Sequence, residues 1–565
     1  MRNLKFIIIG IFLFSLELFA LPQAIEGFIK KSTIPKKDMA IYIKQVGKDV
    51  PVLAALNETT LKTPASVIKV LTTYAAVLKL GFDYHFPTKF YTMGLIQNGV
   101  LDGDLIVKGY GDPTLNSKDL EKIVEKIKQK GIKRITGNIV IDRSFFRVST
   151  KNSSGFDEHP YSAYNAMPDA MMYNERISTI CIVPSKNNVS KKGADASYEV
   201  INQLKTVNKP CRGRYSWPGV KIDTAQATPK IYLKGKISNH CSKQNICQVV
   251  TKPYLSFYYA LKDKLKKEGV VVEGNMRLRK VPQMAKPLFT HYSRSLEKII
   301  SKTAKKSNNL YARHLLLTLG AHVYSAPATL DKGRRAVEQI LRNKGALTQD
   351  GLEIDNGCGL SRTAKLSAKM LADMYADAYK RYGDRWMQTL SIAGVDGTIK
   401  KRFRGTAVKN RAWMKTGTLK RTKNISGYVK DASGQLYEVV ILVQSKRGNW
   451  RASQLQNDII KWLAKRKSTN HTNEAISASN SLSSDEVVID TQAINAKYYV
   501  QAGSFEETPK KSFLLKIERI GVLYKVRYSK KHKVLIGPYA REDDARETLK
   551  KIREKVNPKA FITKL

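Results

Sequence analysis

A stretch rich in Ser, Asn and Thr divides the chain into two parts that fold separately. Residues 467–496 contain the sequence STNHTNEAISASNSLSSDE, in which apolar side chains are rare. Such a composition cannot bury enough apolar surface to fold, and it is typical of a flexible linker. We therefore expect several domains in the first part of this 565-residue chain, followed by one small domain over residues 497–565.

The N-terminus has the pattern of a secretory signal. Arg2 and Lys5 provide a charged region, an apolar run extends from Phe6 to Leu16, and Ala20 is a small residue suited to cleavage. This predicts a signal peptide over residues 1–20. An uncleaved anchor is the alternative, although the run is short for a membrane span. In both cases the rest of the chain is exported.

Basic residues outnumber acidic ones, and the formal net charge is +50. This excess favours an acidic partner: nucleic acid, an anionic membrane surface or an acidic polymer. Export argues against nucleic acid and leaves the cell envelope, including peripheral contact with the inner membrane. The basic residues are spread along the whole chain, however, so a merely solvated surface is the alternative.

The first part predicts an α+β domain with a large insertion. The sequence MAIYIKQVGKDVPVLAALNE alternates like two strands, and an apolar helix follows. Short β-type runs with Gly and Asn turns, such as ITGNIVIDRSFF, then continue until helical periodicity returns near Leu296. We expect one helix-and-sheet domain over residues 25–89 and 285–466, interrupted by β-rich inserted domains over 90–284.

Four of the five cysteines lie in the insertion, and Cys358 stands apart. The four are Cys181, Cys211, Cys241 and Cys247. In an oxidising compartment they allow two disulfides in three connectivities, and buried free thiols are another arrangement. Zinc is less favoured because the chain has no C-x-x-C pair.

The first candidate chemistry lies in TPASVIKVL, where Ser66 and Lys69 share one helical face. The surrounding run is apolar and contains no carboxylate. Desolvation lowers the pKa of a lysine, so a neutral Lys69 would take the proton of a nucleophilic Ser66. On spacing alone, an ordinary surface helix is the favoured explanation of the pair. A Ser-His-Asp arrangement has no support, because no G-x-S-x-G turn is present.

Two later motifs favour the catalytic interpretation. The triplet Ser307-Asn308-Asn309 precedes a predicted helix, and Lys415-Thr416-Gly417-Thr418 begins a predicted strand. Alone, they would be a helix N-cap and an edge-strand turn. Together, S-x-x-K, S-x-N and K-T-G in this order are the signature set of penicillin-binding serine enzymes.

The chain resembles the class C low-molecular-mass penicillin-binding proteins, the D-alanyl-D-alanine carboxypeptidase/endopeptidase family, from about Ile41 to Ala464. The stretches that carry this resemblance are GYGDPTL at 109–115, YNAMPDAMMYNE at 164–175, DNGCGLSR at 355–362 and AGVDGTIKKRFRGT at 393–406. It implies a serine transpeptidase/β-lactamase-like fold. Cys358 departs from the family, which usually has serine there; cysteine is close in size, and an exposed thiol could be oxidised.

The resemblance also implies roles for the motif residues, without a metal or organic cofactor. Ser66 would attack the carbonyl between two D-alanines or in a D-amino-acid cross-link, and β-lactams would acylate it. The implied catalytic residues are Ser66, Lys69 as base, Ser307 as proton relay, Asn309 as positioning group and Lys415 as positive charge. Thr416 and Thr418 would bind the terminal carboxylate, Gly417 would admit the substrate backbone, and the N–H groups of Ser66 and Thr418 would form the oxyanion hole.

The sequence of residues 497–565 predicts a small C-terminal domain with the element order strand, helix, strand, strand, helix, strand. Its Q-x-G-S-F and I-G-P-Y sequences resemble the SPOR domain, whose sheet binds peptidoglycan glycan strands without stem peptides. The implied glycan-binding residues are Gln501, Ser504, Pro538 and Tyr539. An RNA-recognition module has the same order, but its K/R-G-F-G-F-V-x-F run is absent. A sheet with packing aromatics and no ligand is the other alternative.

The sequence thus predicts a periplasmic serine D,D-carboxypeptidase/D,D-endopeptidase that acts on peptidoglycan and is recruited to the division septum by a SPOR tail. A β-lactamase is one alternative, although the 241 residues from Ser66 to Ser307 oppose it. A glycan-binding scaffold with an inactive peptidase domain is the other.

Overall fold

The structure is a computed structural model with two compact units, residues 1–469 and 470–565. It describes residues 21–47, 50–149, 153–467, 498–507, 509, 511–518, 520, 524–528, 531–539 and 542–564. The expected signal peptide and all but the first residue of the expected linker lie outside the described residues. Within the described parts, no helix is both long enough and apolar enough to cross a membrane.

The large unit is built on a main sheet with strand order β16-β17-β18-β19-β1-β2. Its neighbouring strands pair antiparallel. The strands are β1 (Met39–Gln45), β2 (Val52–Leu56), β16 (Ser391–Ile392), β17 (Ala412–Leu419), β18 (Thr422–Lys430) and β19 (Leu436–Gln444). The sheet therefore joins the start of the chain to residues almost 400 positions later.

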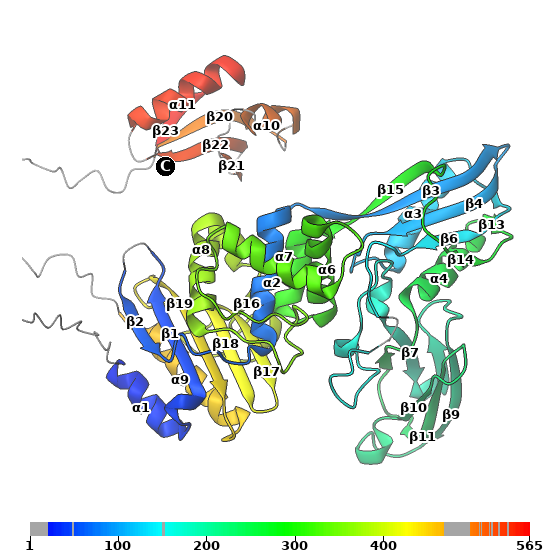
Figure 1. Cartoon of the computed structure of the whole chain (residues 1–565), viewed down its shortest axis with the longest axis horizontal. Helices are drawn as coiled ribbons and strands as arrows, with labels where there is room; N and C mark the ends of the chain where they lie inside the picture. Colours follow the sequence, from blue (N-terminus) through cyan, green and yellow to red (C-terminus); the bar gives the residue numbers. More distant parts are fainter. Residues whose placement is uncertain are drawn as a thin grey trace, which may run out of the picture. The chain divides into compact units, whose positions relative to one another are not determined.

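Helices cover both faces of the main sheet because its inner strands are apolar on both sides (Figure 1). In β1, Met39 and Ile41 pack with α1 (Gln23–Ser32) and α9 (Asn449–Lys465), whereas Ala40 and Tyr42 face the other layer. That layer comprises α2 (Lys69–Leu80), α5 (Leu296–Lys305), α6 (Asn309–Tyr324), α7 (Leu330–Asn343) and α8 (Ala368–Met387).

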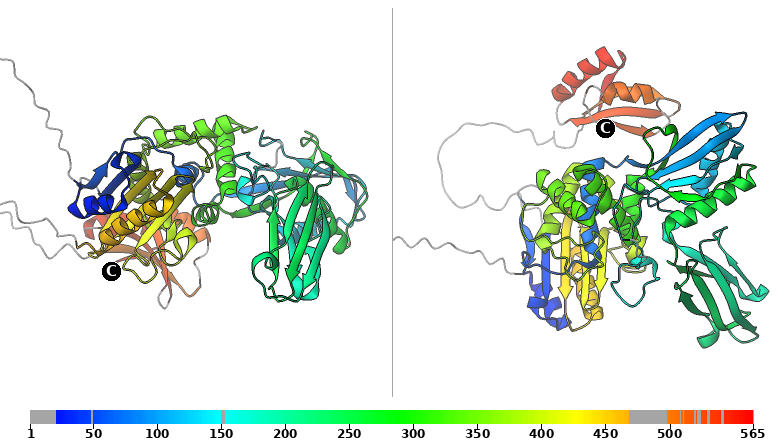
Figure 2. Two further views of the ribbon diagram at one scale, coloured as in Figure 1. Left: turned by 90° about the horizontal axis from the view of Figure 1, so that it is seen from below. Right: turned by 45° about the vertical axis from the view of Figure 1, so that its right-hand side comes forward.

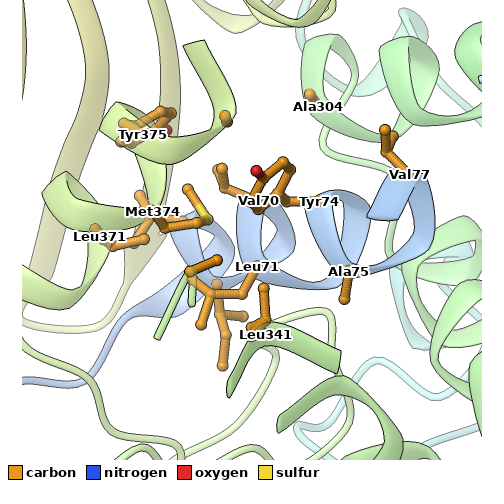
Figure 3. Close-up of a cluster of buried hydrophobic side chains, with 14 of the residues drawn as sticks. Val70, Leu71, Tyr74, Ala75, Val77, Ala304, Leu341, Leu371, Met374 and Tyr375 are labelled. Atoms are coloured by element: carbon orange, nitrogen blue, oxygen red, sulfur yellow. The ribbon is translucent and has the colours of Figure 1, made fainter. Parts of the chain in front are cut away.

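Helix α2 lies at the centre of this second layer and is buried on nearly all sides (Figure 3). Leu71 meets Leu341 of α7 and Leu371 of α8 within one apolar cluster, and Tyr74 packs there against the Trp386 ring at 5.1 Å. A helix that is apolar all round is stable only inside a core. The N-terminus of α2 is thereby fixed in place by side chains from several distant segments.

The insertion, residues 85–295, leaves α2 and returns to α5 through two paired strands. β3 (His85–Gln97) and β15 (Lys286–Ser295) lie antiparallel, with His85 opposite Ser295. They belong to a seven-stranded sheet with β4 (Val100–Gly109), β5 (Arg134–Ile135), β6 (Ile139–Asp142), β13 (Val271–Val272) and β14 (Met276–Leu278). Strand β3 crosses the boundary expected at residue 90, and β15 lies just beyond the one expected at residue 284.

The insertion also contains two helices that the sequence interpretation missed. The prediction of a β-rich insertion omitted α3 (Ser117–Gln129) and α4 (Pro253–Lys267), which pack on the seven-stranded sheet. In α3, Leu120, Ile123 and Ile127 are buried at helical spacing, and Asn116 caps the N-terminus.

A second lobe of the insertion consists of two three-stranded sheets that share one apolar core (Figure 2). Their strands are β7 (Ser178–Val183), β8 (Asn188–Lys191), β9 (Glu199–Val207), β10 (Gly219–Asp223), β11 (Lys230–Ser238) and β12 (Gln244–Gln248).

The cysteines of this lobe form one disulfide, between Cys211 and Cys241, and the two-disulfide arrangement is wrong. Cys181 and Cys247, both described, are free thiols. In the β7–β12 ladder, Cys181 faces Asn245 and Cys247 faces Thr179. The two thiols are therefore diagonal rather than directly opposite neighbours, which separates their side chains.

The small unit has the predicted element order. It consists of β20 (Tyr498–Phe505), α10 (Lys511–Glu518), β21 (Tyr524–Tyr528), β22 (His532–Tyr539), α11 (Glu542–Lys555) and β23 (Phe561–Lys564). The strands form an antiparallel sheet in the order β21-β22-β20-β23. Apolar residues of α11 cover one face, which leaves the other face without a helix among the described residues.

Candidate active site

Ser66 lies in a tight 3-10 turn, η2 (Ala65–Ile68), immediately before α2. Ala65 adopts a left-handed backbone conformation with φ 49°. This conformation is energetically unfavourable for any residue that has a Cβ atom. The amide of Asn424 in β18 holds this turn, since its Nδ2 donates to the carbonyl oxygens of Thr63 (2.9 Å) and Pro64 (2.8 Å). The nucleophile candidate is therefore fastened to the main sheet.

Lys69 points from the first turn of α2 into a closed polar site. Its Nζ lies 2.8 Å from Ser66 Oγ and 2.7 Å from Asn309 Oδ1, and it also donates to the backbone oxygen of Cys358. The side chain is fully buried. The structure therefore brings together Ser66, Lys69 and Asn309 although 240 residues separate the last two in the sequence.

Burial is the main influence on the Lys69 ammonium. The pKa of Lys69 is lowered to about 8, mainly by desolvation; Cys358 opposes this shift, and the nearby Arg313 guanidinium adds to it. Neither Ser66 nor Asn309 supplies a negative charge that would hold the proton. The neutral amine is consequently accessible near physiological pH, as the carboxylate-free sequence predicted.

The S-x-N loop brings Ser307 and Asn309 into this site from the junction of α5 and α6. Ser307 has φ 53°, again left-handed for a residue with a side chain. Ser307 Oγ accepts a hydrogen bond from Lys415 Nζ at 3.0 Å. Asn309 accepts from Lys69 through Oδ1 and donates through Nδ2 to the Tyr164 oxygen at 3.0 Å, so both ends of the amide are occupied.

Glu175 supports this loop from the insertion, and the sequence interpretation gave it no role. Its Oε2 accepts from Asn308 Nδ2 at 2.9 Å, and Oε1 accepts from Lys302 Nζ and from the Tyr311 hydroxyl. The residues from Asn174 to Arg176 all have φ between 52° and 61°. Three consecutive left-handed residues without glycine indicate a conformation that the surrounding structure imposes. In the sequence, the signal that could have pointed to Glu175 was its place at the end of the family-like stretch YNAMPDAMMYNE.

Strand β17 forms the opposite wall of the site. Gly417 lies so close to the nucleophile turn that a Cβ there would stand 2.8 Å from the Pro64 oxygen and 3.0 Å from the Ser66 nitrogen. On the other side, β16 pairs only with Trp413 and Met414. Among the described residues, the edge of β17 from Lys415 onward has no neighbouring strand, so its backbone groups are available to an extended ligand.

Lys415 is buried beside Lys69 and shares its electrostatic environment. Its Nζ donates to Ser307 Oγ and, at 2.6 Å, to the Thr416 oxygen. Desolvation and the like charge of Lys69 lower the pKa of Lys415 well below its ordinary value. The charged form of Lys69 therefore disfavours a second charge on Lys415.

Thr416 and Thr418 lie further along the open edge of the same strand. The Thr416 hydroxyl donates to Thr398 Oγ1 at 2.9 Å, and Lys423 Nζ donates to Thr418 Oγ1 at 3.1 Å. Thr418 is exposed and Thr416 half-buried. All predicted residues of the large unit are thus placed around one site, and Thr398 and Lys423 are additions.

Cys358 also belongs to this site, but through its backbone. Its carbonyl oxygen accepts from Lys69, and its buried thiol lies 3.0 Å from Asn356 Oδ1. Gly359 follows with φ 78°, where a Cβ would collide with the Ala65 oxygen at 1.9 Å. The exposed, oxidisable thiol considered above does not occur.

The predicted glycan-binding residues of the small unit occupy different positions. A register shift in β20 between Gln501 and Gly503 lets Gln501 and Ser504, three residues apart, lie on the same face. Tyr539 packs against the core, and its hydroxyl donates to Thr548 of α11 at 2.9 Å. The side chain of Pro538 lies outside the described residues. All four roles stay predictions.

Comparison with known proteins assigns the large unit. Residues 21–466 match the D-Ala-D-Ala carboxypeptidase 3 (S13) family. The D-alanyl-D-alanine carboxypeptidase DacB of Haemophilus influenzae is 28% identical over 438 residues, 76% of this chain and 90% of the relative. A D-alanyl-D-alanine carboxypeptidase of Actinomadura is 28% identical over 66% of this chain and 72% of its own length.

Solved structures agree with this assignment. The crystal structure of penicillin binding protein 4 (dacB) from Haemophilus influenzae matches with a TM-score of 0.66 and 26% identity, covering 78% of this chain and 99% of that protein. A complex of the same protein with a novel β-lactam matches with a TM-score of 0.63 and 25% identity, with the same coverage. Residues 495–564 match the SPOR domain.

The chain therefore belongs to the S13 family of D-Ala-D-Ala carboxypeptidases, the class C penicillin-binding proteins, and ends in a SPOR domain. The resemblance inferred from the S-x-x-K, S-x-N and K-T-G motifs is confirmed. The fold resembles penicillin binding protein 4 in the large unit, as the motifs implied.

The contact of Gly417 with the nucleophile turn yields a stability prediction. Gly417→Ala places a methyl group against the backbone of Pro64 and Ser66, which cannot rotate away, and should destabilise the large unit by about 1–3 kcal/mol. Gly27→Ala is the control, because Gly27 lies in α1 with open space and should gain about 0.5–1 kcal/mol of helix stability. Thermal unfolding measures both; equal midpoints for Gly417→Ala and the unchanged chain would contradict the tight contact.

Proposed function

We propose that the chain is a serine D,D-carboxypeptidase and D,D-endopeptidase that cleaves peptidoglycan peptides through an acyl-enzyme on Ser66. The observation that carries the proposal is the buried Lys69 amine 2.8 Å from Ser66 Oγ, with a pKa lowered to about 8. The family assignment supports a carboxypeptidase. Endopeptidase action on cross-links requires the same bond cleavage with a longer leaving group.

The hydrogen-bond partners of Lys69 explain why it would act as a base toward Ser66. A neutral amine has two N–H donors and one lone pair. The oxygens of Asn309 and Cys358 can only accept, so they engage the two donors. The lone pair then points to the remaining neighbour, the Ser66 hydroxyl, and takes its proton as Oγ attacks the substrate carbonyl carbon.

The open edge of β17 would hold the substrate in an extended conformation. An extended peptide adds to a free strand edge through backbone hydrogen bonds, and Gly417 leaves space for it beside the Ser66 turn. The backbone N–H groups of Ser66 and Thr418 would stabilise the oxyanion. The hydroxyls of Thr416 and Thr418 would bind the terminal carboxylate of the substrate.

Ser307 and Lys415 would complete the proton transfer. When the peptide C–N bond breaks, the leaving amine needs a proton, and Ser307, whose Oγ lies 3.0 Å from Lys415 Nζ, would give it. The proton that Lys69 took from Ser66 would then restore the Ser307–Lys415 pair, which leaves Lys69 neutral for the next step. An arriving carboxylate favours the charged form of Lys415, which offsets the desolvation of its buried side chain. Asn309 keeps one amide hydrogen for the substrate backbone.

Water would then release the acyl group. It attacks the ester carbon, Lys69 accepts a water proton, the carbon–Oγ bond breaks and Ser66 regains its hydroxyl hydrogen. In a β-lactam the cleaved C–N bond belongs to the ring, so the amine does not diffuse away from the acylated serine. β-Lactams should consequently act as long-lived covalent inhibitors. The solved complex of the Haemophilus influenzae relative with a β-lactam supports binding of this class of compound.

The first experiment is to label the purified chain with a fluorescent penicillin and locate the adduct by peptide mass spectrometry. We expect a stable adduct on Ser66 that is absent from Ser66→Ala, with Ser301→Ala, a serine variant on the neighbouring α5, as control. Rapid β-lactam loss without an adduct would favour a β-lactamase. Neither adduct nor loss from a folded chain would favour an inactive scaffold.

The acylation rate should depend on pH through Lys69. Only the neutral amine accepts the proton, and its fraction increases as pH rises through the pKa of about 8. The second-order rate of penicillin acylation should therefore rise about tenfold per pH unit below 8 and level off above it. Lys69→Ala should lose acylation by a factor of at least 10³ at every pH. A flat profile between pH 6 and 8 would contradict the base role.

The SPOR domain would direct the enzyme to the septum of dividing cells. The domain match supports binding to glycan strands without stem peptides, and the N-terminal sequence supports export to the periplasm. Deleting residues 497–565 should abolish septal enrichment of a fluorescent fusion while purified peptidase activity persists. Unchanged localisation would refute this division of labour, whereas loss of activity would show that the tail acts in catalysis.

A further inference from the structure

The first turn of α9 exposes a tryptophan that the active site does not use. Trp450 is 71% exposed, although it lies only six residues after the end of the buried strand β19. The adjacent Asn449 donates from Nδ2 to the Leu419 oxygen at 3.0 Å, which holds the β17–β18 turn beside Trp450. The Ser445 N–H donates to the Arg421 oxygen at 2.9 Å, so the turn before α9 lies at the same end of the main sheet.

Helix α1 contributes to this surface as well. Arg451 donates to the hydroxyl of Thr33, at the end of α1, at 2.7 Å. Lys31 and Phe28 of α1 line a cleft of about 310 Å³ together with Trp450. Four segments of the chain therefore meet around one exposed indole ring.

Six exposed cations lie on the segments that meet near Trp450. We define the basic face as Trp450 with the exposed Lys31, Lys420, Arg421, Lys446, Arg447 and Arg451. None of these six cations forms an ion pair with a carboxylate in the part of the chain that the structure describes. Asp458, half-buried, is the acidic residue that lines the cleft. The face thus combines an unsatisfied positive charge with an exposed aromatic ring.

This combination matches the boundary of an anionic bilayer. Tryptophan is enriched at membrane–water interfaces, where the ring contacts the acyl region and the indole N–H stays near the headgroups. Lysine and arginine beside it attract anionic headgroups, each contributing about fivefold to binding near the surface. A soluble acidic polymer would use the cations but would gain little from an indole ring that is 71% exposed.

We propose that the basic face docks the large unit on an anionic phospholipid surface. Helix α1 shares an apolar core with α9, so Lys31 and the cations of the α9 turn belong to one rigid surface. The docking is peripheral and does not depend on the proposed catalytic steps.

Vesicle co-sedimentation tests the proposal with residues 21–565, because the apolar export segment would itself insert into lipid. The probes are phosphatidylglycerol–phosphatidylcholine vesicles, with pure phosphatidylcholine vesicles as the neutral reference. Combining Lys420→Gln, Lys446→Gln and Arg447→Gln should weaken binding to the anionic vesicles about a hundredfold. Binding of the unchanged chain should also fall steeply with added salt.

A matched control separates this face from the large net charge of the chain. Lys221, Lys234 and Lys236 are exposed in the insertion, near Trp217, which is 53% exposed. Changing these three lysines to Gln removes the same charge and should weaken binding less than about fivefold. Melting temperature and Ser66 labelling confirm that each variant is folded. Equal losses in both triple variants would attribute binding to net charge and overturn the proposal.

The tryptophans provide a second comparison. Brominated lipids should quench the fluorescence of Trp450, so Trp450→Phe should lose most of the quenching while Trp217→Phe keeps it. Absence of this difference would place Trp450 outside the bilayer and overturn docking. The chain is also tested for binding to purified peptidoglycan. If it binds peptidoglycan as tightly as the vesicles, and the same three substitutions abolish this binding, the face is assigned to an acidic polymer instead.

Discussion

The candidate active site depends on a lysine amine that is buried in an apolar helix layer without a carboxylate partner. Lowering the pKa of Lys69 from 10.5 to about 8 corresponds to roughly 3 kcal/mol less stabilisation of its charged form. Carbonyl and amide oxygens rather than carboxylates surround it, since an acidic partner would restore the charge. The apolar packing of α2 on all sides offsets this cost and also determines where the amine points.

The partners of Lys69 come from three segments that are far apart in the sequence. Ser66 precedes it by one turn, Asn309 follows 240 residues later, and the Cys358 oxygen 289 residues later. The long insertion between Ser66 and Asn309 is compatible with this geometry because β3 and β15 pair with each other where the insertion begins and ends. Its ends therefore stay together, and the closure entropy of the long loop is compensated locally. Glu175 then returns from the insertion to hold Asn308, so the insertion contributes to the site that it interrupts.

Much of this site could be predicted because its chemistry is encoded in short local motifs. Ser66 and Lys69 share a helix face by spacing alone, and the alternation of MAIYIKQ indicates β1. The Glu175 carboxylate, the Cys358 oxygen and the Asn424 amide could not be predicted in the same way. Each acts through a contact across tens to hundreds of residues, and a backbone oxygen has no sequence signal at all. Helix α3 was missed because its lysines and glutamates obscure four apolar positions. The β7–β12 register, which places Cys181 and Cys247 diagonally, has no signal in the sequence either.

Both turns of the candidate active site have strained backbones, and this strain has a structural consequence. Ala65 and Ser307 are left-handed with φ near 50°, a conformation that costs about 1 kcal/mol or more for residues with a side chain. Asn424 and the close approach of Gly359 and Gly417 fix the first turn, while Glu175 fixes the second. Glycine would relieve the strain but would also let each turn relax into other conformations. The side chains therefore make the geometry stiff, so that Ser66, Lys69 and Asn309 are already aligned before a substrate arrives.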